Sequence, residues 1–563
     1  MAPDLHALFQ ALPQAAQDRL AIGSTGMLHL LETAGCCLAQ GTANPAALDT
    51  GADMLLSALG MSPLSGQLAS QILHWPGLAD RLEPKQRALL KTLDQGWKRP
   101  ENLSYFQRLA AHRDMVKLRR FLEGRLQEDE NNLFWREQAL VLAQVEGDPD
   151  FARFALDHGC VNALGPLSAA ALRLVEYHAD NHEAAMELAE QCAPVLGTGA
   201  AASFRAESLL ALGERQEGLD ALLDSLTASP WRTNSLLRAH DLLHGLDSAC
   251  APLRGQVEIL LYTWNKADDL DAALLALAGS DLGLARITAL NNGSTDHTAR
   301  VLAKWQTEFG RDRLRIVELP VNIGAPAARN WLAHSEAADA DLLVYLDDDA
   351  LVPPDWLGRF GTAMQRYPEA GVWGCRVVDD AQPYMLQSVD YHLLPHGNPK
   401  GDVASGPDLA CLEPHPIKLS NLHLQGSDQG QFSYLRPCAS VTGCCHLFRK
   451  DRFLETGDFS LFLSPSQYDD MERDLRMLAS GRLAVYQGHL RVRHRKRTGS
   501  VTMAPGAEGA NALGNRYKMQ VMHGLREMDE AALRERQTLL DDLYGKRRGV
   551  QEALEQRCAA EQD

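Results

Sequence analysis

Three consecutive aspartates, Asp347, Asp348 and Asp349, form the group in this chain with the clearest capacity for chemistry. They follow the apolar run 342–346, which has the length and composition of a buried strand. Because side chains alternate along a strand, Asp347 and Asp349 are expected on one side and Asp348 on the other. Two hard oxygen ligands on one side suit a divalent cation that carries a diphosphate. The alternative is a solvated acidic turn before Pro353.

The segments that lead to the aspartates predict an α/β domain. Short apolar runs alternate with helical stretches, and this alternation is typical of a parallel sheet with crossover helices. The predicted strands are 257–262, 287–290, 314–319 and 342–346, and the predicted helices are 267–278, 296–309 and 325–338. The first three strands are followed by small or polar residues at 263–266, 291–296 and 322–324. These loops should lie beside the aspartates, because open α/β sheets bind ligands at the carboxyl ends of their strands.

The loop residues and the aspartates belong to an ordered series of motifs over residues 257–500. The series comprises Thr263-Trp264-Asn265-Lys266, Asn292-Gly293-Ser294-Thr295-Asp296, Asn322-x-Gly324-x-x-x-x-Arg329-Asn330, Asp347-Asp348-Asp349, Gly457-Asp458-Phe459, Asp469-Asp470, Arg476-x-x-x-x-Gly481 and His494. In this order they resemble the T-Y-N-R, N-G-S-T-D, N-x-G-x-x-x-x-R-N, D-x-D, G-G-F, E-D and R-x-x-x-x-G motifs and the late histidine of the nucleotide-sugar-dependent glycosyltransferases of family 2. The resemblance implies a GT-A fold, which is a Rossmann-like α/β domain with a mainly parallel sheet.

The resemblance also implies a role for each matching residue. Nucleotide-sugar binding is implied for Thr263, Asn265, Asn291, Asn292, Asp296, Arg329, Asp347 and Asp348. A divalent metal, Mg²⁺ or Mn²⁺, is implied at Asp347, Asp349 and His494, since a neutral imidazole can complete a ligand set that carboxylates leave open. A general base is implied at the acidic pair Asp469-Asp470, with inversion of configuration as the outcome.

Three features depart from the family pattern. Tyr262 stands where proline is usual, at the exit of the first strand. Asn291 replaces an aspartate that binds the pyrimidine in many members, although an amide oxygen can also accept that hydrogen bond. Asp469 takes the place of the usual glutamate, and Glu472 that of a later aspartate. The nucleotide base is therefore less defined than the diphosphate, and the general base is Asp470 or, as the alternative, Asp469.

A basic run at residues 491–497 stands out in a chain with 73 acidic and 55 basic residues. Next to the predicted site, such a cluster most simply faces phosphate. We expect Lys496 and Arg497 to steady the departing diphosphate of a nucleotide sugar. The alternative, a strand with solvated outward-facing charges, is expected for Arg491 and Arg493.

Length and composition indicate two or three globular domains. With 563 residues, 45% of them apolar and 23% charged, the chain can bury substantial cores. A formal net charge of −18 and the lack of an extended basic face argue against a nucleic-acid partner. No run approaches the ~20 apolar residues of a membrane span, and the first residues lack the features of a secretory signal. We therefore expect a cytoplasmic protein whose 11 cysteines are reduced.

The N-terminal half has a period of its own. Helical stretches that begin near Arg99, Leu133, Leu167 and Ala201 are spaced by 34 residues, the length of a tetratricopeptide repeat. Stacked helix pairs would form a concave surface for a protein or peptide partner. The alternative is a helical bundle that packs against the enzyme or mediates dimerisation. The expected domains are a helical region at 1–98, the tetratricopeptide-like repeats at 99–246, the GT-A domain at 247–505 and a helical tail at 506–563.

Together, the residues and the resemblance predict an inverting transferase of a hexose or a related sugar. The donor would be a nucleotide-diphosphate sugar, and the acceptor a hydroxyl of a glycan, a lipid-linked glycan or a protein. The alternative is a helical-repeat scaffold or binding protein with an inactive glycosyltransferase domain, against which the retained aspartates, acidic pair and histidine argue. Nucleotidyl transfer to a sugar phosphate is disfavoured, because residues 263–269 after the first strand contain no glycine to cradle phosphate.

Overall fold

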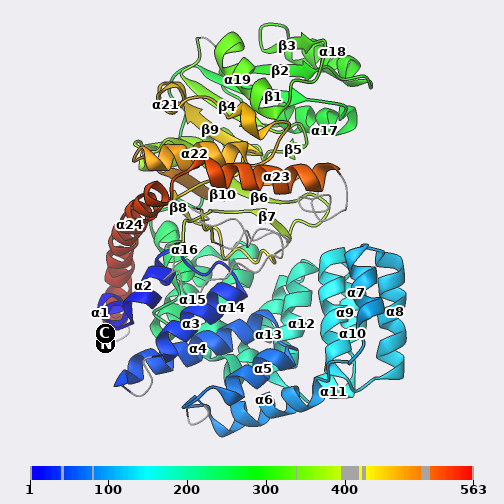
Figure 1. The fold of residues 1–563 in the computed structure, drawn as a ribbon. Coiled ribbons are helices and arrows are strands. Elements are labelled where there is room, and N and C mark those ends of the chain that lie inside the picture. The colour runs from blue at the N-terminus through cyan, green and yellow to red at the C-terminus, as the bar shows by residue number, and fades with distance from the viewer. Residues whose placement is uncertain are drawn as a thin grey trace. The chain divides into compact units, whose positions relative to one another are not determined.

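The chain divides into two compact units, which Figure 1 shows as a ribbon coloured along the sequence. The computed structural model describes residues 3–39, 43–78, 81–337, 339–394, 417–420, 426–495 and 507–560. The helical unit consists of Met1–His244, Gln429–Gln431 and Leu543–Asp563, and the sheet unit of Gly245–Asp428 and Phe432–Asp542. None of the described helices combines the length and the apolar character that a membrane crossing needs.

The helical unit contains the helices α1 to α16. They are α1 (Leu5–Gln10), α2 (Gln14–Ala21), α3 (Met27–Leu38), α4 (Pro45–Met61), α5 (Gly66–His74), α6 (Pro84–Gly96), α7 (Ser104–Ala111), α8 (Met115–Glu128), α9 (Leu133–Glu146), α10 (Pro149–Leu156), α11 (Gly159–Asn162), α12 (Pro166–His178), α13 (His182–Leu196), α14 (Thr198–Ala211), α15 (Arg215–Ala228) and α16 (Thr233–Leu243). The turns α7–α8, α9–α10, α12–α13 and α14–α15 each contain a residue with positive φ, at Arg113, Gly147, Asp180 and Gly213. The same turn geometry thus recurs along this part of the chain.

The described strands of the sheet unit form one mixed sheet in the order β3-β2-β1-β4-β9-β6-β10-β5. They are β1 (Val257–Thr263), β2 (Arg286–Asn292), β3 (Leu314–Leu319), β4 (Leu342–Leu346), β5 (Ala350–Leu351), β6 (Val372–Asp379), β7 (Leu386–Ser388), β8 (Leu435–Cys438), β9 (Cys445–Arg449) and β10 (Ala484–His494). Strands β3, β2, β1 and β4 are parallel neighbours. Strand β9 runs antiparallel between β4 and β6, and β10 is parallel to β6. The two short strands β7 and β8 pair with β6 and β10.

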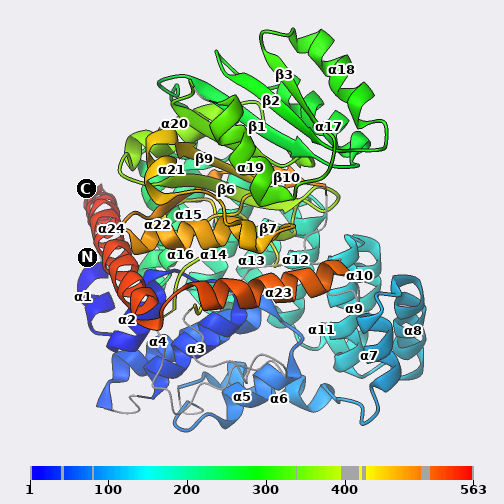
Figure 2. The same cartoon turned by 45° about the horizontal axis from the view of Figure 1, so that its top comes forward.

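Helices cover both faces of this sheet (Figure 2). They are α17 (Ala267–Ala278), α18 (Thr298–Phe309), α19 (Ala325–Trp331) with a π-helical continuation at Leu332–Glu336, α20 (Trp356–Arg366), α21 (Lys450–Thr456), a 3₁₀ turn at Leu461–Leu463, α22 (Asp469–Ala479) and α23 (Ala507–Met522). Helix α24 (Leu525–Ala560) begins in the sheet unit and belongs to the helical unit from Leu543 onward. Alternate residues of β1, such as Ile259 and Leu261, share one apolar core with α17, α18 and α20. On the opposite face, aromatic rings of β4 and β9 contact Phe453 and Phe459. Helices α22, α23 and α24 share a second apolar core.

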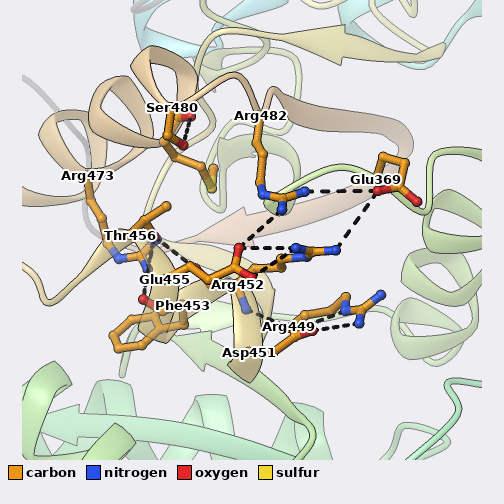
Figure 3. A network of polar contacts seen from close by, with 11 residues as sticks. Glu369, Arg449, Asp451, Arg452, Phe453, Glu455, Thr456, Arg473, Ser480 and Arg482 are labelled. Carbon is orange, nitrogen blue, oxygen red and sulfur yellow. Dashed lines mark hydrogen bonds and ion pairs between the residues drawn. The ribbon is translucent and has the colours of Figure 1, made fainter.

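Helix α22, which begins at Asp469, is held in place by the buried Arg473 (Figure 3). Nη2 of Arg473 donates hydrogen bonds to the carbonyl oxygen of Phe453 and to Oγ1 of Thr456, both at 3.0 Å. The guanidinium also lies 4.1 Å from the centre of the Phe453 ring. These contacts join α22 to the carboxyl end of α21 and so position the acidic pair at the start of α22.

The fold class predicted from the sequence, an all-helical region followed by a GT-A-type α/β domain, is confirmed. The strand expected at 314–319 and the helix expected at 267–278 have the observed bounds. The helix expected at 325–338 is different, because its α-helical part ends at Trp331 and five residues of π-helix follow. The antiparallel strand β9 and its place beside β4 were not predicted.

A leucine pair with opposite exposure tests the sheet core. Leu261 is fully buried in β1, whereas Leu284 is 95% exposed. We expect Leu261→Ala to lower the free energy of unfolding by about 2–5 kcal/mol, because it leaves a cavity in a packed core. Leu284→Ala should change it by less than about 0.5 kcal/mol. Urea unfolding followed by tryptophan fluorescence measures both, and equal effects of the two substitutions would contradict this description of the core.

Candidate functional site

The sheet unit contains a cavity of about 400 Å³ at the carboxyl ends of β1 and β4. Its lining includes Tyr262, Lys266, Arg329, Asp347, Asp349, Gln387, Tyr391, Gly443, Cys444, Tyr468, Asp469, Asp470, His494, Leu513 and Arg516. Six of the residues singled out in the sequence therefore meet in one place: Arg329, Asp347, Asp349, Asp469, Asp470 and His494. The aspartates lie in a turn after β4, and Asp348 is not among the described residues that line the cavity.

Arg329 joins the two acidic groups of the cavity. This residue of α19 is 5% exposed. Its Nη1 lies 2.6 Å from Oδ2 of Asp469, and its Nη2 lies 3.5 Å from Oδ1 of Asp347. The guanidinium also packs 5.3 Å from the centre of the Tyr262 ring. A planar buried cation with several donors can hold two carboxylates at once, so Arg329 fixes the distance between the end of β4 and the start of α22.

Lys266 holds the other two aspartates. Its Nζ lies 2.9 Å from Oδ1 of Asp348 and 2.8 Å from Oδ2 of Asp349. Burial opposes the charge on the ammonium, but the two carboxylates raise the pKa of Lys266 above its usual value. Burial raises the pKa of Asp348 to about 6, against the effect of Lys266. Burial also acts on Asp349, yet its contacts with His494 and Lys266 keep the pKa of Asp349 below its usual value.

His494, at the end of β10, is oriented by two contacts. Its Nδ1 lies 2.7 Å from Oε1 of Gln387, and its Nε2 lies 2.8 Å from Oδ1 of Asp349. An amide oxygen only accepts, so Nδ1 carries a proton, and Nε2 is directed at the carboxylate of Asp349. Burial lowers the pKa of His494, but the neighbouring Asp349 raises it, and the net shift is upward.

The described residues bring one group of donor atoms together that could hold a metal ion, from Asp347, Cys444 and His494. These atoms lie within 4.8 Å of one another. A carboxylate oxygen, a thiol and an imidazole nitrogen are all ligands of divalent transition metals, so the residues fit a metal centre. The group shares Asp347 and His494 with the predicted set and adds Cys444, while Oδ1 of Asp349 lies 2.8 Å from Nε2 of His494.

The acidic pair at the start of α22 is divided between two environments. Asp469 is 2% exposed, and its carboxylate faces Arg329. Asp470 is half-buried. Its Oδ2 accepts a hydrogen bond from the backbone nitrogen of Gly443 at 2.5 Å, and its Oδ1 one from the nitrogen of Met471. The two carboxylates are adjacent in sequence, but Asp469 is neutralised by a direct cation and Asp470 is held by backbone donors.

Four residues predicted to bind the nucleotide sugar form hydrogen bonds that organise the loops. Asn265 accepts hydrogen bonds from the nitrogens of Thr295 and Asp296. Oδ1 of Asn291 accepts one from the nitrogen of Ser294, and its Nδ2 donates to Glu318. Asn292 bonds Asn322 and the nitrogen of Ile323, and Asp296 accepts from Thr298 and the nitrogen of Ala267. None of these four is among the described residues that line the cavity.

Three predicted residues, Thr263, Lys496 and Arg497, are not among the described residues that line the cavity, and three unpredicted ones are. Thr263 is 1% exposed at the end of β1, and Lys496 and Arg497 lie outside the described residues. Gln387, Cys444 and Gly443 were missed by sequence reasoning. The adjacent cysteines 444 and 445 were visible in the sequence, but only the pairing of β9 with β4 places Cys444 beside Asp347.

Comparison with known proteins relates part of the sheet unit to a protein family. Residues 258–453 match the family model described as glycosyl transferase family 2. This stretch is a family 2 glycosyltransferase domain. The match covers the first three loop motifs and the aspartates. The acidic pair and His494 lie beyond it, so their assignment rests on the shared cavity.

Solved structures that match the chain include two glycosyltransferases with bound ligands. A mannosyltransferase from Pyrobaculum calidifontis, in complex with GDP-Man and Mn²⁺, is 17% identical, with 61% of this chain and 87% of that chain covered and a TM-score of 0.35. GalNAc-T7 with UDP, GalNAc and Mn²⁺ is 13% identical, with 51% of this chain and 57% of that chain covered and a TM-score of 0.34. A search of curated proteins gave no match.

Gly443 allows the close approach of the charged groups, and this can be tested. A Cβ atom added there would lie 2.7 Å from Oδ2 of Asp470 and 2.9 Å from Nη2 of Arg329. We expect Gly443→Ala to lower the free energy of unfolding by about 1–3 kcal/mol, because buried charged groups must separate. Gly514→Ala in α23 is the matched control, since nothing lies within 4 Å of its Cβ position. Equal stability of the two variants in chemical denaturation would contradict this reading of the cluster.

A buried carboxyl on α22 predicts a pH dependence of stability. Burial raises the pKa of Asp474 to about 7, while its Oδ2 accepts hydrogen bonds from Ser440 and the nitrogen of Val441. A carboxyl with a raised folded-state pKa stabilises most below its unfolded pKa of about 3.9, and this stability is lost as the pH rises towards 7. Asp474→Asn, which stays neutral, should therefore gain melting temperature relative to wild type between pH 5 and pH 8.

The control for this pH profile is Asp312→Asn at an exposed position. Its melting temperature should follow that of wild type at every pH in differential scanning fluorimetry. A constant difference between Asp474→Asn and wild type across the pH range would show that Asp474 is not the titrating group.

Proposed function

We propose that the sheet unit catalyses the inverting transfer of a sugar from a nucleotide-diphosphate donor to a hydroxyl acceptor. The observation that carries the proposal is the single cavity lined by Asp347, Asp349 and His494 at one side and by the pair Asp469-Asp470 at the other. The family 2 match over residues 258–453 supports sugar transfer as the class of reaction. The donor diphosphate would lie against the first group, and the acceptor hydroxyl against the second.

We further propose that a divalent cation, Mg²⁺ or Mn²⁺ as first expected, takes part. When bound, it would neutralise the negative charge that develops on the leaving diphosphate. Asp347 and His494 are the residues of the predicted set that the donor group supports as ligands. Asp349, the third residue of the predicted set, stays a proposed ligand, and its carboxylate contacts Lys266 and His494.

Asp470 is proposed as the general base. Its partner Asp469 lies 2.6 Å from the buried guanidinium of Arg329, and a proton taken up there would break this ion pair. Among the residues that the structure describes, none forms an ion pair with Asp470, whose Oδ2 accepts a hydrogen bond from the nitrogen of Gly443, and Asp470 lines the cavity. It would remove the proton of the acceptor hydroxyl as the acceptor oxygen bonds to the anomeric carbon and the bond to the diphosphate oxygen breaks. Attack from the face opposite the leaving group gives inversion.

The nucleotide contacts proposed from the family pattern differ in their support. Arg329 and Asp347 line the cavity and remain candidates for direct contact with the donor. Asn265, Asn291, Asn292 and Asp296 would act by shaping the loops, because their polar atoms bond neighbouring loop residues. For Asp348, Thr263, Lys496 and Arg497 the assignment to donor binding stays a prediction.

For the helical unit we propose tetratricopeptide-like repeats over residues 99–246 that recruit a macromolecular acceptor or a protein partner. The recurring left-handed residue in the four turns, at Arg113, Gly147, Asp180 and Gly213, supports a repeated structure. The alternative is a scaffold protein with an inactive glycosyltransferase domain. It differs from the proposed enzyme in one measurable respect, because a scaffold would not turn over the sugar donor.

The test is a screen of the purified full chain against a panel of nucleotide sugars. The proposal expects one donor to be hydrolysed slowly to its nucleoside diphosphate and the sugar, with activity lost after chelation and restored by added metal ion. Absence of turnover for every donor, in a protein that is folded and binds a nucleotide sugar in calorimetry, would favour the scaffold alternative.

Substitution of the base should separate donor binding from turnover. Asp470→Asn is nearly isosteric but cannot take up the acceptor proton, so kcat/KM should fall about 10²- to 10⁴-fold while the donor Kd changes little. Asp451→Asn, at an exposed position on α21, should behave as wild type. Asp469→Asn should instead lower stability, because it leaves Arg329 without its closest partner. If Asp469→Asn alone were inactive and stable, the assignment of the base would have to be reversed.

A further inference from the structure

Cys444 lies where a third metal ligand would be expected. The antiparallel register of β4 with β9 pairs Leu346 with Cys445, so the next residues, Asp347 and Cys444, are neighbours at the ends of the two strands. The nitrogen of Asp347 donates a hydrogen bond of 2.8 Å to the carbonyl oxygen of Cys444. Main-chain pairing therefore fixes a carboxylate and a thiol side by side at the cavity wall.

The thiol of Cys444 faces the cavity from a buried position. Cys444 lines the cavity and is only 5% exposed. The adjacent Cys445 is fully buried and is not among the described residues that line the cavity. Of these two neighbouring thiols, one is thus directed to the site.

His494 supplies a nitrogen to the same place. Gln387 holds its Nδ1, as a ligand histidine is usually held by a second partner, while its Nε2 lies 2.8 Å from Oδ1 of Asp349. Asp349 is not in the group of donor atoms within 4.8 Å of one another; its Oδ1 lies 2.8 Å from Nε2 of His494 and its Oδ2 lies 2.8 Å from Nζ of Lys266. The donors that converge are one oxygen, one nitrogen and one sulfur.

We propose that Cys444 is a metal ligand, and that the centre formed by Asp347, Cys444 and His494 binds a thiophilic divalent cation such as Zn²⁺ or Co²⁺ more tightly than Mg²⁺. Thiolate and imidazole ligands favour these ions, whereas Mg²⁺ prefers oxygen ligands and retains water. On coordination the sulfur–hydrogen bond of Cys444 is broken, sulfur becomes the ligand as thiolate, and the proton passes to solvent. The proposal concerns cation binding and does not depend on sugar transfer.

The experiment is a titration of the purified full chain with Co²⁺, followed by absorption spectroscopy. A cobalt–thiolate bond gives a charge-transfer band in the near ultraviolet, and we expect it to grow to one equivalent of Co²⁺ and to disappear when Zn²⁺ is added. Excess Mg²⁺ should not displace Co²⁺. Absence of the band in the folded wild-type chain, or displacement of Co²⁺ by Mg²⁺ at a similar concentration, would overturn the proposal.

Substitutions identify the cysteine that supplies the sulfur ligand. Cys444→Ser should abolish the band and weaken Co²⁺ binding at least about tenfold, whereas Cys445→Ser, the matched control, should retain both. Asp347→Asn removes no thiol but should also weaken binding, which excludes exposed cysteines such as Cys250 as the source of the band. If the band in Cys444→Ser or in Asp347→Asn kept the intensity and the titration midpoint in Co²⁺ concentration of the wild-type chain, the cobalt would be bound at another site.

A second measurement covers the case in which Cys444→Ser does not fold. The ¹¹³Cd resonance of the wild-type chain loaded with one equivalent of Cd²⁺ should show the chemical shift of a site with one sulfur ligand. A shift typical of oxygen and nitrogen ligands alone would overturn the proposal without any substitution. Sugar transfer, measured separately on the same samples, can fail or succeed without changing either spectroscopic result.

Discussion

The cavity depends on the burial of one guanidinium among carboxylates. Without Arg329, Asp347 and Asp469 would face each other in a poorly solvated place, where two ionised carboxylates are unstable together. The ion pair joins Arg329 of α19 to Asp469, the first residue of α22, 140 positions apart in sequence. Because Arg329 also packs on Tyr262, the aromatic residue at the exit of β1 belongs to the same arrangement. Lys266 has the equivalent function for Asp348 and Asp349, so two cations keep the acidic centre charged.

Local patterns were sufficient for the first half of the sheet unit. Apolar runs separated by helical stretches gave β1 to β4 and the helix α17, because β1, β2 and β4 are short runs of almost continuously buried residues and α17 buries residues at helical spacing. The second half could not be obtained in this way. Strand β9 precedes β10 in the chain but lies between β4 and β6, and such non-local pairing leaves no periodic signal in a single segment.

The same distinction explains which site residues were found. Motif order pointed correctly to the groups that meet in the cavity, including the pair at Asp469 and the distant His494. It could not separate residues that line the cavity from those, such as Asn291 and Asp296, that hold the loops through main-chain hydrogen bonds. Both kinds appear in a motif, because a loop that carries chemistry must also have a defined shape. Cys444 had no motif at all, and only the strand register relates it to Asp347.

Gly443 has a consequence for how activity can be read from related sequences. Its hydrogen atom occupies a place from which a methyl group would press on both Asp470 and Arg329. A natural relative with a larger residue there could retain every charged residue of the family pattern and still lack a working arrangement. Pseudoenzymes are usually recognised by missing catalytic side chains. In this architecture a single added methyl group at the position of Gly443 could abolish activity in the same way. A comparison of catalytic side chains between sequences would not detect this change.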